Sequence, residues 1–286
     1  MSYEPNGKII VITGGAGGIG SALAHSLAAD GATIIVADLD GAGADAVAAN
    51  LPGNGHLGYG IDLTDRAQVE ALIAFIAASY GRIDVLVNNA GMTSADRFDE
   101  RSVESIEHEL NVNLLAPLVL SRLAIPLLQV SADPRICTTV SLGGIFPLGE
   151  TPIYTASKFG LRGAMLAIGM DLAAKGITVG SVLPSATDTP MLRQEALDGG
   201  NSLQFLDPPQ TPEDVVRAFR KLLDKPRYEV YPKPSESWLV RVVMLTPSVI
   251  PKALPLFRGR GERGMAKYLA SLEARGLIPA RDTGRT

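Results

Sequence analysis

Residues 8–20 read KIIVITGGAGGIG, and this stretch decides the fold. Residues 8–13 form an apolar run rich in β-branched side chains, which is typical of a buried strand. Glycines follow at once, and an alanine-rich segment to about Asp30 predicts a helix. A glycine-rich turn between a first strand and a first helix is where α/β sheets bind dinucleotides.

Glycine suits this turn because it allows tight backbone angles and lets the main chain approach a pyrophosphate at a helix N-terminus. The alternative is that the glycines serve only packing. The candidate cofactor contacts in the turn are Gly14, Gly18, Ile19 and Gly20.

Strands and helices alternate along the rest of the chain, which predicts an α/β fold with a parallel sheet covered on both faces. Asn113 and Pro117 are expected to disturb a long helix over 102–130, and 184–209 is expected to be rich in loops. The further strands are predicted at 33–37, 56–61, 85–87, 136–140, 178–183 and 228–231, and the further helices at 41–51, 65–80, 102–130, 154–174 and from 211 onward.

Composition narrows the function. The 286 residues are 46% hydrophobic, enough for one large α/β domain or two small ones. A net charge of −4 provides no basic field for nucleic acid. The single cysteine, Cys137, permits no intrachain disulfide, and we see neither an apolar leader nor an uninterrupted apolar run of membrane-spanning length. We therefore expect a cytoplasmic protein, and we expect no metal site.

Asp38 follows Gly14 by 24 residues and ends the second predicted strand. A carboxylate there can accept hydrogen bonds from both ribose hydroxyls of a dinucleotide, and it repels a 2′-phosphate. The alternative is an ordinary solvated Asp at a strand end. In this context the residue favours NAD over NADP.

Tyr154 and Lys158 stand four residues apart, so on a helix they share a face. An ammonium beside a phenol favours the phenolate, so we expect Lys158 to lower the pKa of Tyr154 and make it a proton donor and acceptor near neutral pH. Ser141 ends the apolar run 136–140, where a hydroxyl can reach a ligand in the crevice of an open sheet. Taken alone, a Tyr–Lys pair is more often a solvated helix face.

Together these motifs resemble the short-chain dehydrogenase/reductase family over about the first 190 residues. The resemblance implies a Rossmann-type doubly wound parallel sheet of about seven strands. The activity it implies is the transfer of a hydride between NAD and a secondary alcohol or ketone. The motifs that carry it are TGGAGGIG (13–20), Asp38, Asp62 with Leu63, NNAG (88–91), Asn113 in NVNL, Ser141, and YTASK (154–158).

The resemblance also implies catalytic roles. Tyr154 exchanges a proton with the substrate oxygen, and Ser141 hydrogen-bonds that oxygen. Lys158 lowers the tyrosine pKa and holds the nicotinamide ribose. Asn113 interrupts its helix and positions a water in the proton relay.

For the cofactor, the resemblance implies that Asp62 and Leu63 flank the adenine. The remaining implied contacts are Asn89, Ala90 and Gly91 along the cleft, and Pro184, Thr187 and Thr189 near the carboxamide. Ser185 departs from the family, which commonly has glycine after that proline. Serine resists the backbone angles that glycine allows, so the path of 184–191 is left open.

The substrate end is expected to be apolar, which suits a lipophilic, steroid-like alcohol or ketone under a lid formed by 184–209. For Phe205, a place in the ordinary core is equally open. The residues expected near the substrate, beside Ser141 and Tyr154, are Leu142, Ile145, Phe146, Leu148, Met191, Leu192 and Phe205.

The expected division is a catalytic domain over 1–231 and a C-terminal extension over 232–286. Residues 238–257 are mostly apolar, prolines at 247, 251 and 255 exclude one straight helix, and a basic run follows. We expect a helical cap that packs on the domain, a partner subunit or a membrane surface. Small residues along 156–167 favour a homodimer or homotetramer.

Two other functions remain open. One is an NADPH-dependent carbonyl reductase. The other is a non-catalytic NAD-binding sensor or scaffold, against which the joint presence of Asn113, Ser141, Tyr154 and Lys158 argues.

Overall fold

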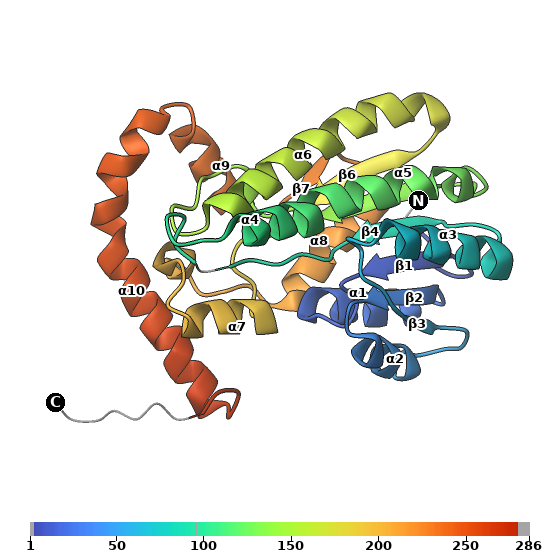
Figure 1. Ribbon diagram of the computed structural model, residues 1–286, viewed down its shortest axis with the longest axis horizontal. Coiled ribbons are helices and arrows are strands. Elements are labelled where there is room, and N and C mark those ends of the chain that lie inside the picture. The colour runs from blue at the N-terminus through green and yellow to red at the C-terminus, as the bar shows by residue number, and fades with distance from the viewer. Residues whose placement is uncertain (1–2, 95, 280–286) are drawn as a thin grey trace.

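A seven-stranded parallel sheet forms the centre of the molecule (Figure 1) in the computed structural model, which describes residues 3–94 and 96–279. The strand order is β3-β2-β1-β4-β5-β6-β7, so the order reverses between β1 and β4. In open α/β sheets such a reversal opens a crevice at the carboxyl ends of the strands. The strands are β1 (Ile9–Thr13), β2 (Thr33–Asp38), β3 (Leu57–Gly60), β4 (Val85–Asn88), β5 (Arg135–Thr139), β6 (Thr178–Val182) and β7 (Glu229–Val230).

Helices cover both faces of the sheet (Figure 1), as the alternating pattern predicts. One core lies under α1, α2 and α8, and the other lies under α3, α5 and α6. Within β1, Ile10 and Ile12 enter the first core while Ile9 and Val11 enter the second. This explains why the strand is apolar throughout. The helices are α1 (Gly18–Ala28), α2 (Gly41–Ala49), α3 (Arg66–Tyr80), α4 (Val103–Leu110), α5 (Ala116–Leu128), α6 (Pro152–Leu172), α7 (Pro190–Leu197), α8 (Pro212–Asp224), α9 (Pro234–Val243) and α10 (Ile250–Ala274).

The long helix predicted over 102–130 is divided by a π-helical turn, Asn111–Leu115, between α4 and α5. Asn113 lies in this turn and is fully buried, which confirms that it interrupts the helix. By length and composition the stretch Val103–Leu128 could cross a membrane. In this structure one face of the stretch packs against the sheet, through Leu120, Ala124 and Leu128.

The expectation that 184–209 is mostly loop is wrong for its middle, which forms α7. Thr189 begins this helix by accepting a hydrogen bond from the Leu192 N–H, and Pro190 occupies its first position. Both residues are standard helix-start signals. Gly199, with φ of +75°, follows the helix end.

The C-terminal residues form α9 and then α10, which runs along the edge of the molecule (Figure 1). The two helices are separated at 244–249, so the prediction against one straight helix is confirmed, although Pro255 lies inside α10. Two glycines of α10 allow close approach to the short 3₁₀ turn Ser202–Phe205. A Cβ at Gly261 would lie 2.5 Å from the Ser202 carbonyl oxygen, and one at Gly264 would overlap the Phe205 carbonyl.

A third apolar cluster joins α7, the 202–205 turn and α10. The rings of Phe205 and Tyr268 lie 5.3 Å apart within it. Asp188, just before α7, accepts hydrogen bonds from Tyr268 Oη at 2.7 Å, Arg275 at 2.8 Å and Arg193 at 2.9 Å. Although burial raises the pKa of Asp188, these hydrogen bonds hold it below its ordinary value. Thus α7 and α10 are joined by both apolar packing and charge.

Candidate active site

The turn between β1 and α1 requires glycine at two positions. Gly14 has φ of +61°, and a Cβ on it would lie 2.8 Å from the Ala90 Cα. A Cβ on Gly20 would overlap the Gly14 carbonyl oxygen. The turn therefore leaves a close-packed cradle at the N-terminus of α1, where backbone N–H groups favour an anionic ligand.

Asn89 ties three strand ends together beside this cradle. Its side-chain amide donates to the carbonyls of Thr13 and Gly14, both at 3.1 Å. Its Oδ1 accepts a hydrogen bond from Thr139 Oγ1 at 2.9 Å. The Ala90 N–H donates to Thr13 Oγ1 at 3.1 Å. The NNAG motif thus holds the carboxyl edges of β1, β4 and β5 in register.

Asp38 ends β2 as predicted and faces the glycine-rich turn. Its two carboxylate oxygens accept hydrogen bonds from the Ala16 N–H at 2.9 Å and the Asp40 N–H at 3.1 Å. Each oxygen keeps a second lone pair for a ligand hydroxyl. The Ile61 N–H bonds to the Asp38 carbonyl, which brings Asp62 and Leu63 to the same edge of the sheet.

The four predicted catalytic residues lie close together around two glycines. A Cβ on Gly143 would lie 3.1 Å from Tyr154 Cε1 and 3.4 Å from Ser141 Oγ. A Cβ on Gly91 would lie 3.3 Å from Asn113 Oδ1 and 3.4 Å from Lys158 Nζ. The Lys158 Nζ lies 5.5 Å from the centroid of the Tyr154 ring.

The expectation that Lys158 brings the pKa of Tyr154 near neutral is wrong in this structure. Burial raises the pKa of Tyr154 to about 12, the hydrogen bond with Ser141 opposes that rise, and the charges of Glu195 and Glu109 add to it. Burial also lowers the pKa of Lys158 to about 8, against the effect of Glu109. Desolvation dominates both values because Lys158 is buried and Tyr154 is half-buried, and sequence spacing does not reveal burial.

Asn113 uses its whole side-chain amide within the protein. Oδ1 accepts from the Met92 N–H at 2.8 Å, and Nδ2 donates to the Met92 carbonyl at 2.8 Å and to Ser157 Oγ at 3.2 Å. The amide therefore clamps the chain that leaves β4. The water contact predicted for Asn113 stays a prediction.

The sequence motifs do not identify two acidic residues, Glu109 and Glu195, whose charges act on Tyr154. Glu109 on α4 is fully buried and pairs with buried Arg101 at 2.6 Å. Glu195 on α7 is 8% exposed, accepts a hydrogen bond from Gln204, and has its pKa raised to about 6 by burial. Glu109 precedes Asn113 by one helical turn, which is a usable signal. Glu195 lies in the segment expected to be loop, so no face was assigned to it.

The chain turns after β6 at Pro184 and Ser185, with serine where the family commonly has glycine. Among the described residues, no residue other than glycine has a positive φ, so Ser185 fits this turn without strain. Its hydroxyl accepts a hydrogen bond from buried Gln210 at 2.6 Å. The Leu142 N–H donates to the Pro184 carbonyl, and Thr187 Oγ1 donates to the Ser185 carbonyl.

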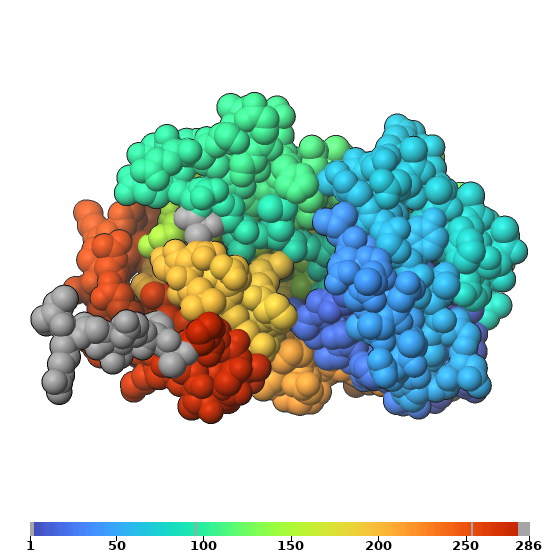
Figure 2. Space-filling view, turned by 60° about the horizontal axis from the view of Figure 1, so that its bottom comes forward, coloured from blue at the N-terminus to red at the C-terminus, as the bar shows by residue number. Residues whose placement is uncertain are grey.

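Thr189, at the start of α7, lies against the cofactor cradle, because a Cβ on Gly18 would be 3.0 Å from its Cγ2. Figure 2 shows the surface hollowed between the α7 region, in gold, and the N-terminal segment, in blue. The predicted cofactor contacts on both segments therefore border one cleft.

The predicted substrate residues divide into two groups. Leu148 lies beside the cluster, since a Cβ on Gly143 would be 3.4 Å from its Cδ1. Leu142 and Phe146 are half-buried and Met191 is 43% exposed. By contrast, Ile145 is part of the core under α3, α5 and α6, and Leu192 and Phe205 belong to the cluster with α10. The expectation that Ile145 and Leu192 line the substrate site is wrong, because packing covers them, and for Phe205 the alternative of a place in the core holds.

The fold and the cluster at its carboxyl edge define an oxidoreductase built on a dinucleotide-binding sheet. The family model described as short chain dehydrogenase matches residues 8–198. The chain belongs to this family, and it is an oxidoreductase of the kind that uses a nicotinamide cofactor.

Known relatives differ in their substrates. D-threitol dehydrogenase of Mycolicibacterium smegmatis is 33% identical over 73% of this chain and 81% of its own length. The 3-oxoacyl-(acyl-carrier-protein) reductase of Escherichia coli is 35% identical over 68% of this chain and 78% of its own. A solved 3-ketoacyl-(acyl-carrier-protein) reductase from Brucella melitensis, complexed with NADH, superposes with a TM-score of 0.71 at 26% identity over 81% of this chain and 99% of that chain.

Proposed function

We propose that this protein transfers a hydride between NAD and a lipophilic secondary alcohol or ketone. The observation that carries the proposal is the meeting of Tyr154, Ser141 and Lys158 at the sheet edge that also holds the glycine cradle. Gly14 and Gly20 let the backbone of this turn pack tightly on itself and on Ala90, which sets the N-terminus of α1 directly after β1, and a helix N-terminus in that position suits a pyrophosphate. The residues present therefore suit a dinucleotide.

Each polar group has a distinct task in this proposal. With a pKa of about 12, Tyr154 carries its proton at neutral pH and donates it to a ketone oxygen. In the oxidation of an alcohol the same group accepts the hydroxyl proton as the phenolate, so oxidation is expected to speed up as pH rises. Ser141, hydrogen-bonded to Tyr154, orients the same oxygen. Lys158, anchored on the Thr139 carbonyl at 3.4 Å, directs its ammonium toward the cleft edge at Gly91. A bound nicotinamide supplies the hydride.

Asp38 supports NAD as the cofactor. Its half-buried carboxylate faces the glycine-rich turn and repels a 2′-phosphate, while its free lone pairs suit ribose hydroxyls. The NADH in the Brucella melitensis structure agrees with this preference. The NADPH-dependent carbonyl reductase remains the competing cofactor choice.

The side chains around Tyr154 support a lipophilic substrate. Leu142, Phe146 and Leu148 are apolar and only partly covered, so a hydrophobic molecule gains by burying them. The competing class is a small polyol, because D-threitol dehydrogenase is a relative.

The test is a substrate screen read by NADH absorbance, with 2-decanol, a hydroxysteroid and D-threitol, each with NAD and NADP. We expect turnover with NAD and the hydrophobic alcohols. Tyr154→Phe should lower kcat by a factor of about 10³ while NADH still binds, because the ring stays and the transferable proton is lost. Full activity of Tyr154→Phe, or turnover of the polyol alone, would contradict the proposal. NADH binding without turnover of any alcohol would favour the non-catalytic sensor.

A further inference from the structure

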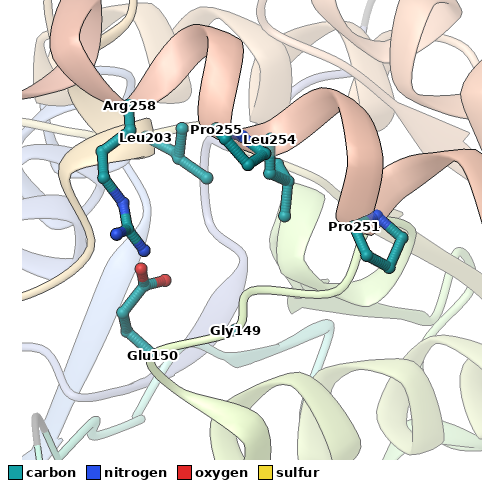
Figure 3. Close-up of a pocket in the computed structure, with 7 residues that line it drawn as sticks. All are labelled: Gly149, Glu150, Leu203, Pro251, Leu254, Pro255 and Arg258. Atoms are coloured by element: carbon teal, nitrogen blue, oxygen red, sulfur yellow. The ribbon is translucent and has the colours of Figure 1, made fainter.

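A cavity of about 350 Å³ lies between α10 and the loop that leads into α6 (Figure 3). Its size falls within the usual range of small-molecule sites. One wall is apolar, and Arg258 and Glu150 point toward one another at the other side (Figure 3). The apolar wall consists of Leu203, Pro251, Leu254 and Pro255.

We propose that this cavity is the outer part of the substrate site and holds the apolar body of an elongated alcohol or ketone whose oxygen reaches Tyr154. The inference rests on the proposed function and adds to it the shape of the substrate and a role for the C-terminal helix.

The loop side of the cavity lies close along the chain to the catalytic cluster. Glu150 precedes Tyr154 by four residues, so their Cα atoms lie at most about 14 Å apart. Leu148, two residues before Glu150, is one of the side chains that meet beside Gly143 next to Tyr154. Leu148 therefore links the surroundings of Tyr154 to the loop residues that line the cavity.

The opposite side is connected to the cluster in the same way. Leu203 is followed by Gln204, which donates a hydrogen bond to Glu195. The charge of Glu195 acts on Tyr154. Leu203 is thus linked to the catalytic tyrosine through Gln204 and Glu195, and α10 supplies the outer wall of the cavity.

Because Glu150 and Arg258 carry opposite charges, the shape of the cavity rather than its charge should select the substrate. Glu150 and Arg258 are both exposed and face one another, so they offer no single net charge to a substrate headgroup. The apolar wall is then the main contact for whatever enters. This arrangement favours a long uncharged chain or fused rings over a four-carbon polyol, which would leave the wall uncovered.

The experiment compares Leu254→Trp with Leu256→Trp. Leu254 lines the cavity, whereas Leu256 lies two residues further along the same helix and is 81% exposed. We expect Leu254→Trp to raise KM for 2-decanol about tenfold, equivalent to roughly two buried methylene groups, and to leave kcat/KM for 2-butanol within about twofold. The matched Leu256→Trp variant should change neither. If Leu254→Trp does not fold, Leu203→Trp fills the cavity from the opposite wall.

A second measurement is independent of turnover. Binding of the apolar fluorescent dye 1-anilinonaphthalene-8-sulfonate should weaken in Leu254→Trp and not in Leu256→Trp. If the wild type oxidises neither alcohol, the proposed function fails and the dye alone decides whether the cavity binds apolar ligands. Equal effects of the two substitutions in both measurements would overturn the inference.

Discussion

Glu195 shows how a single buried carboxyl group can affect catalysis. Burial raises its pKa to about 6, so its charge changes within the working range of many enzymes. Once ionised, it raises the pKa of Tyr154 and makes that tyrosine harder to deprotonate. The protonation state of Glu195 is therefore coupled to the proton-transfer group.

Glu195→Gln gives a test with a defined sign. In the folded protein the pKa lies above the unfolded value of 4.5, so the stability from the neutral acid is fully present below about 4.5 and lost as pH rises through about 6. Relative to wild type, Glu195→Gln should gain about 2 kcal/mol in unfolding free energy between pH 4.5 and 7.5. Urea unfolding at the two pH values measures this. A difference that does not vary with pH, or an equal change in exposed Glu107→Gln, would contradict it.

At the scale of residues, the sequence predicts which groups meet but not their protonation. Spacing and strand ends suffice to bring Tyr154, Lys158 and Ser141 together, because helix and sheet periodicity determine their directions. The pKa of Tyr154 depends on its burial and on the charges of Glu195 and Glu109, which come from distant parts of the chain. The Asn113 amide likewise bonds to Met92, a backbone partner that no motif identifies.

At the scale of elements, the β1–α1 turn has no room for a side chain at Gly20. Gly20→Ala places a Cβ against the Gly14 carbonyl, a backbone atom that cannot move aside cheaply. We expect a lower Tm and at least a tenfold weaker affinity for NADH, measured by thermal unfolding and fluorescence titration.

The control is Gly163→Ala on α6, where a Cβ would meet no atom of the described chain within 4 Å. It should keep NADH affinity and gain up to about 1 kcal/mol of stability, because alanine is the better helix former. Equal losses in the two variants would show that the turn has no special need for glycine.

Element prediction fails for α7 for a reason visible in the chain. Thr189 and Pro190 are helix-start signals, but the helix has only eight residues and depends on Leu192 and Ala196 packing against α10. Isolated helices of that length are unstable. Such a helix forms through tertiary contacts, so local pattern alone does not reveal it.

For the whole molecule, the exposed face of α6 supports the predicted homo-oligomer. Ala156, Gly160, Gly163 and Ala167 are all exposed along one side of this helix. We expect wild type to be a dimer or tetramer at micromolar concentration and Gly163→Trp to be smaller, because the indole prevents close helix approach. Light scattering after gel filtration measures the mass, with Gly163→Ala as control. A monomeric wild type, or an unchanged mass in Gly163→Trp, would count against this surface.

The C-terminal helices carry a second exposed surface, and peripheral membrane contact remains a proposal for it. Trp238, Leu245 and Leu256 are 67%, 80% and 81% exposed, and 238–263 contains five basic residues and one acidic residue. Apolar side chains beside basic ones suit an anionic bilayer.

We expect the protein to sediment with anionic vesicles at low salt and to be released at high salt. Leu245→Glu should weaken the association, whereas Val130→Glu, which replaces another exposed apolar residue, should not. Protein that stays wholly in the supernatant would exclude this contact. A cytoplasmic location stays a prediction.

The hydrogen bonds of Asp188 couple the position of α10 to the loop 187–189, and so to the expected rate of cofactor release. This carboxylate lies between Thr187 and Thr189 in the chain and holds Tyr268 and Arg275 near the end of α10. Restraining the last helix therefore restrains the loop that borders the nucleotide. We expect a molecule wedged beneath α10 to delay the departure of spent dinucleotide, so that exchange of cofactor rather than hydride transfer would pace the catalytic cycle.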